Sequence, residues 1–547
     1  MLLYDSFLFL LMVVLIAPLP DTVTPVSTSS SSSSSSFSIF REPITSAKDL
    51  INLSNRAIEE LRIFIYTIPK DAKIVSKEGS KVLRHFSIEE GFKKYVQTSS
   101  LVYKSKDTSP NIRITHDPDE ANAFIIDHNT AQIYLDHSDD CELLYDKHLL
   151  PIIDNVITKY PYFNRSYGAD HFYIDTFDTG TICADMNIFF YNFLYTKPTC
   201  IENRRKFVNK IRNVSFVGNY GMDLASFTKG LQIIDIGRVV NMTGEVCHRP
   251  DKDIVIPQPT DPERVGRGKA RSLREHPKLM REFDSTFSGS IWGDRMPLSS
   301  MALKATYEYL KNSTEDFGYD FNGGFRDLSL IHRGYYMYAP CGAACWSMRL
   351  YEALEFKTIP ILVSDGPIQA FEKFIDWSKI SVKISTQTWR DHERLMLFRQ
   401  KLRNTSDELR SVHKREADKL TIQSHIEGVR GLECGKVGVK CEGKQLLRLN
   451  HELEINEAAR NEIKALEDTF IVKKIHAIEN VTDFFDYNDA DDALKSRTKQ
   501  PDASAYKMIL LEMWCRVAAL NVNNHFPNGV HRACLNNADH TARMEYF

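Results

Sequence analysis

The fold is decided by the stretch from Tyr338 to Val382, which reads YAPCGAACWSMRLYEALEFKTIPILVSDGPIQAFEKFIDWSKISV. A loop with Pro340 and Gly342 comes first, a helical pattern follows, and Ile359–Val363 reads as a short buried strand. A loop that opens a helix beside such a strand is how α/β proteins build anion sites, because free backbone N–H groups and the positive helix end face the anion. The stretch therefore predicts an α/β fold with an anion site in this loop.

The predicted helix carries Arg349 and Glu352, which are three residues apart and share one helix face. In an anion site the arginine can bind a diphosphate and the glutamate a sugar hydroxyl. The alternative is a surface ion pair worth roughly a few tenths of a kcal/mol. Spacing alone favours the ion pair, so the flanking sequence has to decide.

That flanking sequence resembles the C-terminal motif of the exostosin-like glycosyltransferases, family 47. The matching positions are Pro340, Gly342, Ser347, Arg349, Glu352, Ala353, Ile359, Pro360, Ser364, Asp365, Phe371, Asp376, Trp377, Ser381 and Val382. Two departures concern loop geometry: Lys357-Thr358 stands where the family has Gly-Cys, and Gln369-Ala370 where Leu-Pro is common.

Upstream segments resemble further motifs of the same family. They are residues 63–66, 117–122, 160–172, 252–257 and 283–289. The resemblance covers roughly residues 60 to 385 and implies the GT-B fold, an α/β architecture of two facing Rossmann-like domains. Helical spacing of apolar residues after residue 390 adds a helical C-terminal extension of unknown role.

The expected domain organisation follows from these motifs and from composition. It comprises a signal anchor or signal peptide (1–20), a Ser-rich stem (21–55), an N-terminal acceptor domain (56–250), a C-terminal nucleotide-sugar domain (251–390) and the extension (391–547). The Pro/Gly/Arg-rich stretch 257–277 is predicted to be an exposed loop, and the acidic stretch 483–492 a surface loop.

The donor chemistry is assigned to the second domain. Arg349 is the best diphosphate clamp, because a guanidinium binds phosphate oxygens in a bidentate manner, and Glu352 is the candidate for ribose or sugar hydroxyls. The other predicted donor-binding residues are Gly342, Ser347, Gly289 and the weaker candidate Arg295.

The resemblance implies an inverting reaction, which needs one general base. His171 with Asp170 is the first candidate, because an imidazole is neutral and competent near neutral pH. An equally weighted alternative is that both residues only hold their loop. Asp175, at the end of the following strand, is the second candidate for the base.

No metal and no cofactor are predicted. Asp-x-Asp occurs at 117–119, 251–253 and 489–491, each in a turn or an acidic loop rather than at the end of an apolar strand. Arg349 with the helix end can replace a cation, so the sites are read as structural. The chain has ten cysteines, which suit an oxidising lumen and favour disulfides whose pairing stays open.

The N-terminus predicts a secretory-pathway protein. Residues 7–17 form an uninterrupted apolar run that fits a signal peptide, and the residues before it extend the run enough for a weak anchor. The family is typically held in the Golgi membrane with a lumenal catalytic domain. A cleaved signal would give a secreted protein.

The sequence thus predicts an inverting Golgi glycosyltransferase that uses a UDP-sugar and extends a polysaccharide or glycoprotein glycan. Expected partners are the UDP-sugar, the glycan acceptor, the membrane through the N-terminal segment, and other exostosin-like chains in a homo- or hetero-oligomer. A net charge of −3 predicts no nucleic-acid partner. The alternative is an inactive subunit that stabilises an active homologue, and the transferred sugar is left open.

Overall fold

The computed structural model describes residues 46–70, 72, 88–101, 113–128, 142–176, 198–219, 248–249, 252–275, 281–288, 317–320, 328–340, 348–363, 369–385, 388, 391, 393–408, 410–411, 470–487, 504–520 and 534. All of them belong to one unit, residues 39–547. The predicted signal segment lies outside these ranges. Within them, no helix is long and apolar enough to span a bilayer.

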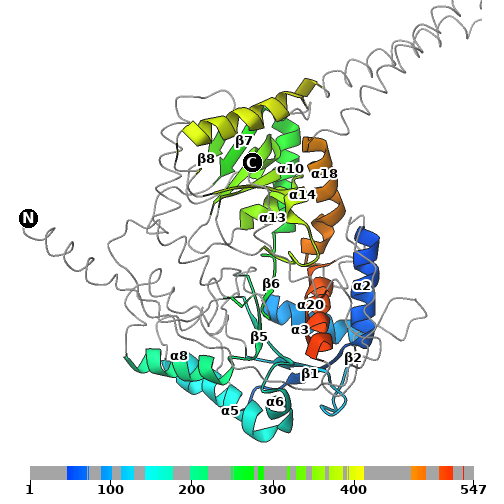
Figure 1. Ribbon diagram of the computed structural model, residues 1–547, viewed down its shortest axis with the longest axis vertical. Coiled ribbons are helices and arrows are strands. Elements are labelled where there is room, and N and C mark those ends of the chain that lie inside the picture. The colour runs from blue at the N-terminus through cyan, green and yellow to red at the C-terminus, as the bar shows by residue number, and fades with distance from the viewer. Residues whose placement is uncertain are drawn as a thin grey trace, which may run out of the picture. The chain divides into compact units, whose positions relative to one another are not determined.

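The first sheet, of which β1, β2, β5 and β6 are labelled in Figure 1, consists of six parallel strands in the order β2-β1-β3-β4-β5-β6. The strands are β1 (Arg62–Tyr66), β2 (Arg113–Ile114), β3 (Ala123–Ile126), β4 (His171–Asp175), β5 (Ser215–Gly218) and β6 (Ile254–Val255). Strands β3 and β4 are buried along their whole length, as a parallel sheet covered on both faces requires. The apolar runs at 63–66, 123–126 and 171–174 of the sequence coincide with β1, β3 and β4.

Helices cover both faces of this sheet. They are α2 (Ala47–Glu60), α3 (Ile88–Leu101), η2 (Leu143–Leu149), α5 (Leu150–Lys159), α6 (Pro161–Ser166) and α8 (Pro198–Lys210). Alternate strand residues divide between two clusters: Phe124 packs with η2, α5 and α8, whereas Ile125 packs with α2 and α3. This alternation is what a strand with two buried faces produces.

Two predicted boundaries differ from the structure. Residues 47–55, expected to end the stem, form the start of α2, whose first turn is fixed by a capping box between Ser46 and Asp49. Strand β6 pairs with β5, so the first sheet extends past residue 250.

The second sheet has five parallel strands in the order β11-β10-β9-β7-β8. The strands are β7 (Phe283–Ser288), β8 (Phe317–Asp320), β9 (Gly334–Pro340), β10 (Ile359–Val363) and β11 (Val382–Ile384). Its helices are α10 (Pro262–Glu275), α12 (Leu328–His332), α13 (Met348–Glu355) and α14 (Trp377–Ile380). Two parallel α/β sheets in one chain agree with the predicted fold class, and residues 393–408 add a further helix near the predicted position.

The loop predicted for residues 257–277 is wrong, because most of it is α10. Asp261 accepts a hydrogen bond from the backbone N–H of Arg264 at 3.1 Å, and Pro262 occupies the first helical position, where no N–H is needed. Gly268 lies so close to α12 that a Cβ there would be 2.8 Å from Leu328 Cβ. Tertiary packing therefore overrides the low helix propensity of the glycines.

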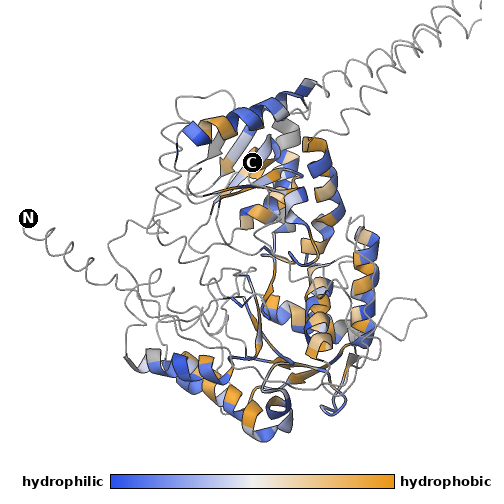
Figure 2. Cartoon of the chain, in the orientation of Figure 1, coloured by the Kyte–Doolittle hydropathy of each residue, from blue (hydrophilic) through white to orange (hydrophobic). Residues whose placement is uncertain are grey.

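The extension contributes α18 (Phe470–Val481), the 3-10 turn η4 (Thr482–Phe485) and α20 (Ala505–Leu520). Residues 483–485 are not the expected surface loop, since Phe485 is buried and its ring centroid lies 5.3 Å from that of Trp377. Helix α20 is apolar almost all round (Figure 2) and packs against α2 and β3. A helix of this composition belongs to a core, so the extension is part of the folded body.

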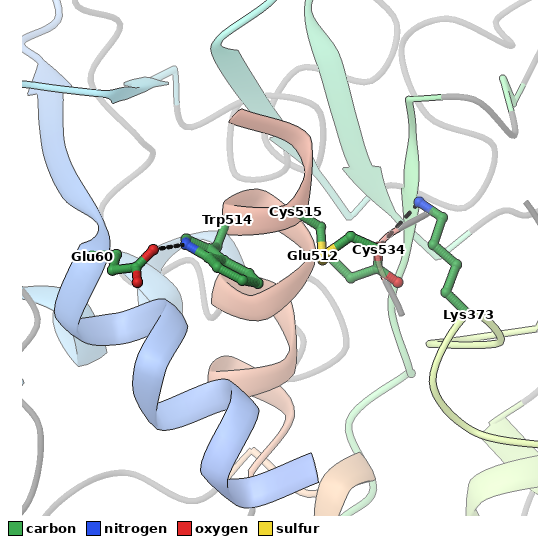
Figure 3. The surroundings of a disulfide bond; sticks show 6 residues. All are labelled: Glu60, Lys373, Glu512, Trp514, Cys515 and Cys534. Carbon is green, nitrogen blue, oxygen red and sulfur yellow. Dashed lines mark hydrogen bonds and ion pairs between the residues drawn. A yellow bond between two sulfur atoms is a disulfide. The ribbon is translucent and has the colours of Figure 1, made fainter. Parts of the chain in front are cut away.

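Figure 3 shows how α20 is fixed. Trp514 Nε1 donates to Glu60 Oε2 at 2.9 Å, and Lys373 Nζ donates to Glu512 Oε2 at 3.1 Å. A disulfide joins Cys515 to Cys534, in agreement with the expectation of disulfides; the sequence had left this pairing open.

Candidate active site

The second sheet has a topological switch point between β7 and β9. From β7 the chain adds β8 on one side, and then β9, β10 and β11 on the other. In open parallel sheets ligands bind beyond the carboxyl ends of the two strands that flank such a point. These ends are Ser288 of β7 and Pro340 of β9.

Arg349 is anchored at this switch point. It lies on α13, which follows β9, and its Nε donates a hydrogen bond to the backbone oxygen of Ser288. Its guanidinium carbon lies 5.5 Å from the ring centroid of Phe287. The Ser288 hydroxyl is buried and has no hydrogen-bond partner. An arginine and an unsatisfied hydroxyl thus meet at the edge where an anionic ligand is expected.

Glu352 lies on the same helix and is 1% exposed. It lies three residues after Arg349, and a carboxylate in a ligand site is a suitable acceptor for ligand hydroxyls. The prediction that Arg349 and Glu352 share one helix is confirmed. The other four predicted donor residues, Gly342, Ser347, Gly289 and Arg295, lie outside the described residues.

The departure at Lys357-Thr358 has a structural account. Lys357 follows α13 with φ of 54°, a left-handed conformation that favours the glycine usual in the family. Thr358 Oγ1 accepts a hydrogen bond from Arg281 at 3.0 Å and donates one to the Ile331 oxygen at 2.9 Å. These contacts lie at the amino end of β10, away from the switch point and from the contact between Arg349 and Ser288.

Asp170 and His171 form a buried network. His171 Nδ1 is 2.7 Å from Asp170 Oδ1, and His171 Nε2 is 2.9 Å from the Tyr66 hydroxyl. Asp170 also accepts hydrogen bonds from Ser166 and from Arg165, the latter at 3.1 Å. Burial lowers the pKa of His171, so the ring is neutral. Burial alone would raise the pKa of Asp170, but the bonds from His171, Ser166 and Arg165 lower it overall.

This network lies toward the amino end of β4. His171 is the first residue of that strand and pairs with Phe124 in the middle of β3. Its ring is 0% exposed and stacks on Phe124 at 4.7 Å. The geometry favours the alternative in which Asp170 and His171 hold their loop. Asp175, the second candidate for the base, ends β4 at the carboxyl edge and is buried.

A charged cluster that the sequence reading missed lies beyond the switch point of the first sheet, between β1 and β3. Lys93 Nζ on α3 lies 2.5 Å from Asp127 Oδ1 and 3.9 Å from Glu89 Oε1, and His128 Nδ1 lies 3.3 Å from Glu89 Oε1. Burial, with a smaller contribution from Lys93, lowers the pKa of His128 well below its ordinary value. The available signal was that two polar residues directly follow the buried strand β3.

Two aspartates of the Asp-x-Asp segments, Asp117 and Asp253, make local hydrogen bonds in the structure. Asp253 accepts a hydrogen bond from the Phe216 N–H at 2.9 Å and pairs with Arg249 at 2.7 Å. Asp117 accepts from the backbone N–H of Asp119 at 3.0 Å, which is a local turn. Across the described ranges, no three His, Cys, Asp or Glu side chains are grouped as a metal site would need.

Two parallel sheets, one with an arginine-bearing ligand edge, place the molecule among the α/β enzymes of the GT-B glycosyltransferase class. Comparison with known families makes the assignment specific: the Exostosin GT47 domain model matches residues 58–397, and the chain belongs to this family of glycosyltransferases. The family resemblance read from the sequence is confirmed.

Similar proteins are plant glycosyltransferases. A protein from Oryza sativa subsp. japonica that carries the name probable glucuronosyltransferase is 24% identical over 346 residues, which cover 60% of this chain and 67% of that protein. The probable beta-1,4-xylosyltransferase IRX10 of Arabidopsis thaliana is 24% identical over 349 residues, 61% of this chain and 70% of that protein. The solved structure of WaaG, a glycosyltransferase involved in lipopolysaccharide biosynthesis, is 11% identical in sequence. Its superposition covers 66% of this chain and 100% of the WaaG chain, with a TM-score of 0.24, which is too low to support an argument.

Proposed function

We propose that this glycosyltransferase moves a sugar from a UDP-sugar, with inversion, onto a polysaccharide or glycoprotein glycan in the Golgi lumen. The observation that carries the proposal is the anchoring of Arg349 beside Ser288 at the switch point of the second sheet. A guanidinium fixed at a strand end is suited to a diphosphate leaving group, whose charge grows as the glycosidic bond breaks.

The donor chemistry is divided between two residues of α13. Arg349 would neutralise the diphosphate, and Glu352 would accept hydrogen bonds from ribose or sugar hydroxyls. Because the guanidinium can supply the positive charge, we propose that no metal ion is required. Treatment with EDTA should leave turnover unchanged; a loss of turnover that manganese restores would contradict this.

For the general base we favour Asp175 over His171. Asp175 ends β4 at the carboxyl edge, whereas both ring nitrogens of His171 already face Asp170 and Tyr66. A base must reach the acceptor hydroxyl within hydrogen-bond distance, and ligands bind at the carboxyl edge of parallel sheets.

The test is a screen of UDP-sugars for hydrolysis by the purified full chain. We expect one UDP-sugar to be hydrolysed and Arg349→Lys to lower its turnover by roughly 10²-fold, since a lysine cannot reproduce the bidentate contact. Arg333→Lys is the matched control: Arg333 pairs with Glu282 at the amino end of the same sheet, so its change should leave turnover near normal. Equal turnover of both variants would refute the assigned role of Arg349.

The same screen addresses the inactive-subunit alternative, which hydrolysis of any UDP-sugar would exclude. Golgi location and membrane attachment through the N-terminal segment are further parts of the proposal. Immunolocalisation of the full chain, with N-terminal sequencing of the mature protein, tests both and separates an anchor from a cleaved signal. Copurification with other exostosin-like chains would test the expected oligomer.

A further inference from the structure

The carboxyl edge of the first sheet carries a buried amide with no partner. Gln258 comes three residues after β6 and is 0% exposed, and neither its Nε2 nor its Oε1 makes a hydrogen bond. The backbone beside it is fixed, because the Tyr487 hydroxyl donates to the Pro257 oxygen at 2.8 Å. Among the buried side-chain amides of the described part of the chain, no other leaves both of its polar atoms unpaired.

A second amide with an unpaired atom follows the neighbouring strand. Asn219 comes directly after β5 and is 4% exposed. Its Nδ2 donates to the Thr176 oxygen at 3.2 Å, while its Oδ1 has no partner. Because β5 and β6 pair in parallel, with Gly218 opposite Val255, both amides lie beyond the same edge of the sheet.

The strand pairing also places this edge beside the proposed base. Gly218, the residue before Asn219, is the register partner of Asp175. The two strands approach closely here, since a Cβ on Gly218 would lie 2.7 Å from the Asp175 oxygen. Asn219 therefore follows the strand next to the one that ends in Asp175, and Gln258 follows the next strand along the sheet.

Burying polar atoms without partners is costly, and native proteins do it where a ligand or ordered water completes the bonding. A side-chain amide offers a donor and an acceptor side by side, which matches two neighbouring hydroxyls of a sugar ring. An anionic sugar fits less well, because its carboxylate could accept from Nε2 of Gln258, while Oε1 of Gln258 and Oδ1 of Asn219 would be left without a donor. The chemistry selects an uncharged saccharide.

We propose that Gln258 and Asn219 form a subsite that binds the hydroxyls of a neutral sugar residue of the acceptor glycan, next to the hydroxyl that Asp175 activates. The acceptor role rests on the proposed function. Binding of the saccharide itself does not, because it can be measured without donor or turnover.

The experiment uses the full chain as wild type, Gln258→Leu and Ser215→Ala. Leucine keeps the approximate size of glutamine and removes both polar atoms. Ser215→Ala is the matched control, because the Ser215 hydroxyl is also buried and unpartnered but lies at the opposite, amino end of β5. Both substitutions remove an unsatisfied buried group, so neither should lower the melting temperature.

The probes are the neutral oligosaccharides xylohexaose, cellohexaose and mannohexaose, with binding followed by saturation-transfer NMR and calorimetry. We expect wild type to bind at least one of them, Ser215→Ala to bind it equally, and Gln258→Leu to raise its Kd by roughly 10-fold or more. Asn219→Leu should also weaken the binding of that saccharide.

Equal affinity of wild type and Gln258→Leu would overturn the subsite, as would the absence of binding by all three probes. Hydrolysis of UDP-sugar without acceptor reports the donor site separately. If hydrolysis occurs but the saccharide result is negative, the subsite fails and the proposed function stands. If saccharide binding behaves as expected but no UDP-sugar is hydrolysed, the subsite stands and the proposed function fails.

Discussion

Truncating His171 separates a structural role from a catalytic one. The ring is fully buried, stacks on Phe124 at 4.7 Å and meets Phe163 edge-on at 5.0 Å. His171→Ala removes these contacts, leaves a cavity, and takes one hydrogen bond each from Asp170 and Tyr66. Large-to-small changes of this kind with a partner left unsatisfied cost about 3–5 kcal/mol.

That cost is a large part of a typical unfolding free energy of about 5–15 kcal/mol. A milder variant is therefore needed. Tyr66→Phe removes only the hydroxyl that meets His171 Nε2 at 2.9 Å, at an expected cost of about 1 kcal/mol. His171→Asn keeps a polar group near Asp170 and gives an intermediate loss.

The assay compares urea unfolding with turnover, measured at a temperature where every variant is folded. If His171 only holds its loop, His171→Asn lowers the unfolding free energy by about 2–3 kcal/mol and turnover by less than roughly 10-fold, whereas loss of a general base costs roughly 10²–10⁴-fold. Asp175→Asn should show the opposite: near-normal stability and roughly 10²–10⁴-fold lower turnover.

The structural role of His171 is refuted if the unfolding free energy of His171→Asn lies within about 1 kcal/mol of the wild-type value while its turnover falls by roughly 10²-fold, a loss of the size expected for a catalytic base. The role of Asp175 as the base is refuted if Asp175→Asn retains full turnover. The two variants together assign the base, because each serves as the control for the other.

Further predictions concern stability. Three buried histidines have a lowered pKa, caused first by burial: His128, His148 and His171. Each of these histidines binds more protons in the unfolded chain than in the native chain below about pH 6.5, so each lowers the unfolding free energy as the pH drops from about 7.5 to about 5.5, whereas Glu355 and Glu372, whose pKa burial raises to about 7, act in the opposite direction. His128→Gln removes one histidine contribution, so its unfolding free energy should fall less, or rise more, than that of wild type over this range; denaturant titrations that show the same pH dependence for both chains would disprove this. Lys357→Gly should stabilise the chain by up to about 1 kcal/mol, because it relieves the left-handed backbone at φ 54° and loses only the partly exposed ion pair to Glu479. The control Glu479→Gln measures the contribution of that ion pair by itself. A lower melting temperature for Lys357→Gly than for wild type would contradict the assignment of backbone strain to Lys357. Cys515→Ser should cost about 3 kcal/mol, the value expected for a loop of 19 residues, and Cys534→Ser should match it; an unchanged melting temperature under non-reducing conditions would show that the disulfide contributes nothing.

Much of the fold could be predicted from the sequence, because its strands are continuous apolar runs between polar segments. Ile359–Val363 was predicted from such a run and is β10, and Ala123–Ile126 is β3. A fully buried parallel strand has no alternating pattern to misread. The placement of Arg349 and Glu352 on one helix followed from their spacing alone.

The helix α10 was missed because its stability does not come from its own residues. Two glycines and several charged residues in Pro262–Glu275 argue locally for a loop. Only the close packing of Gly268 against Leu328 shows why a residue without a side chain is favoured there. No window of sequence contains that contact, since α12 lies some fifty residues further along the chain.

The burial of the C-terminal extension was difficult to predict for the same reason. Helix α20 was not predicted to bury Trp514 or to contact Glu60, which precedes it by 454 residues. An apolar surface all round a helix indicates that the helix is buried, but no local signal tells which elements cover it. Its role becomes visible once α2 and β3 are seen to need a cover on that face of the sheet.

The choice between His171 and Asp175 shows what limits a site prediction. Both are polar residues at an end of the same buried strand, so composition and motif treat them alike. They are four residues apart, about 13 Å along a strand, and only the register with β3 and β5 shows which end faces the ligand edge. The chemistry divides accordingly: at the end with His171, both ring nitrogens and the Asp170 carboxylate are engaged by the protein, as a structural network requires. The end with Asp175 lies among amides whose hydrogen bonds a ligand has yet to complete.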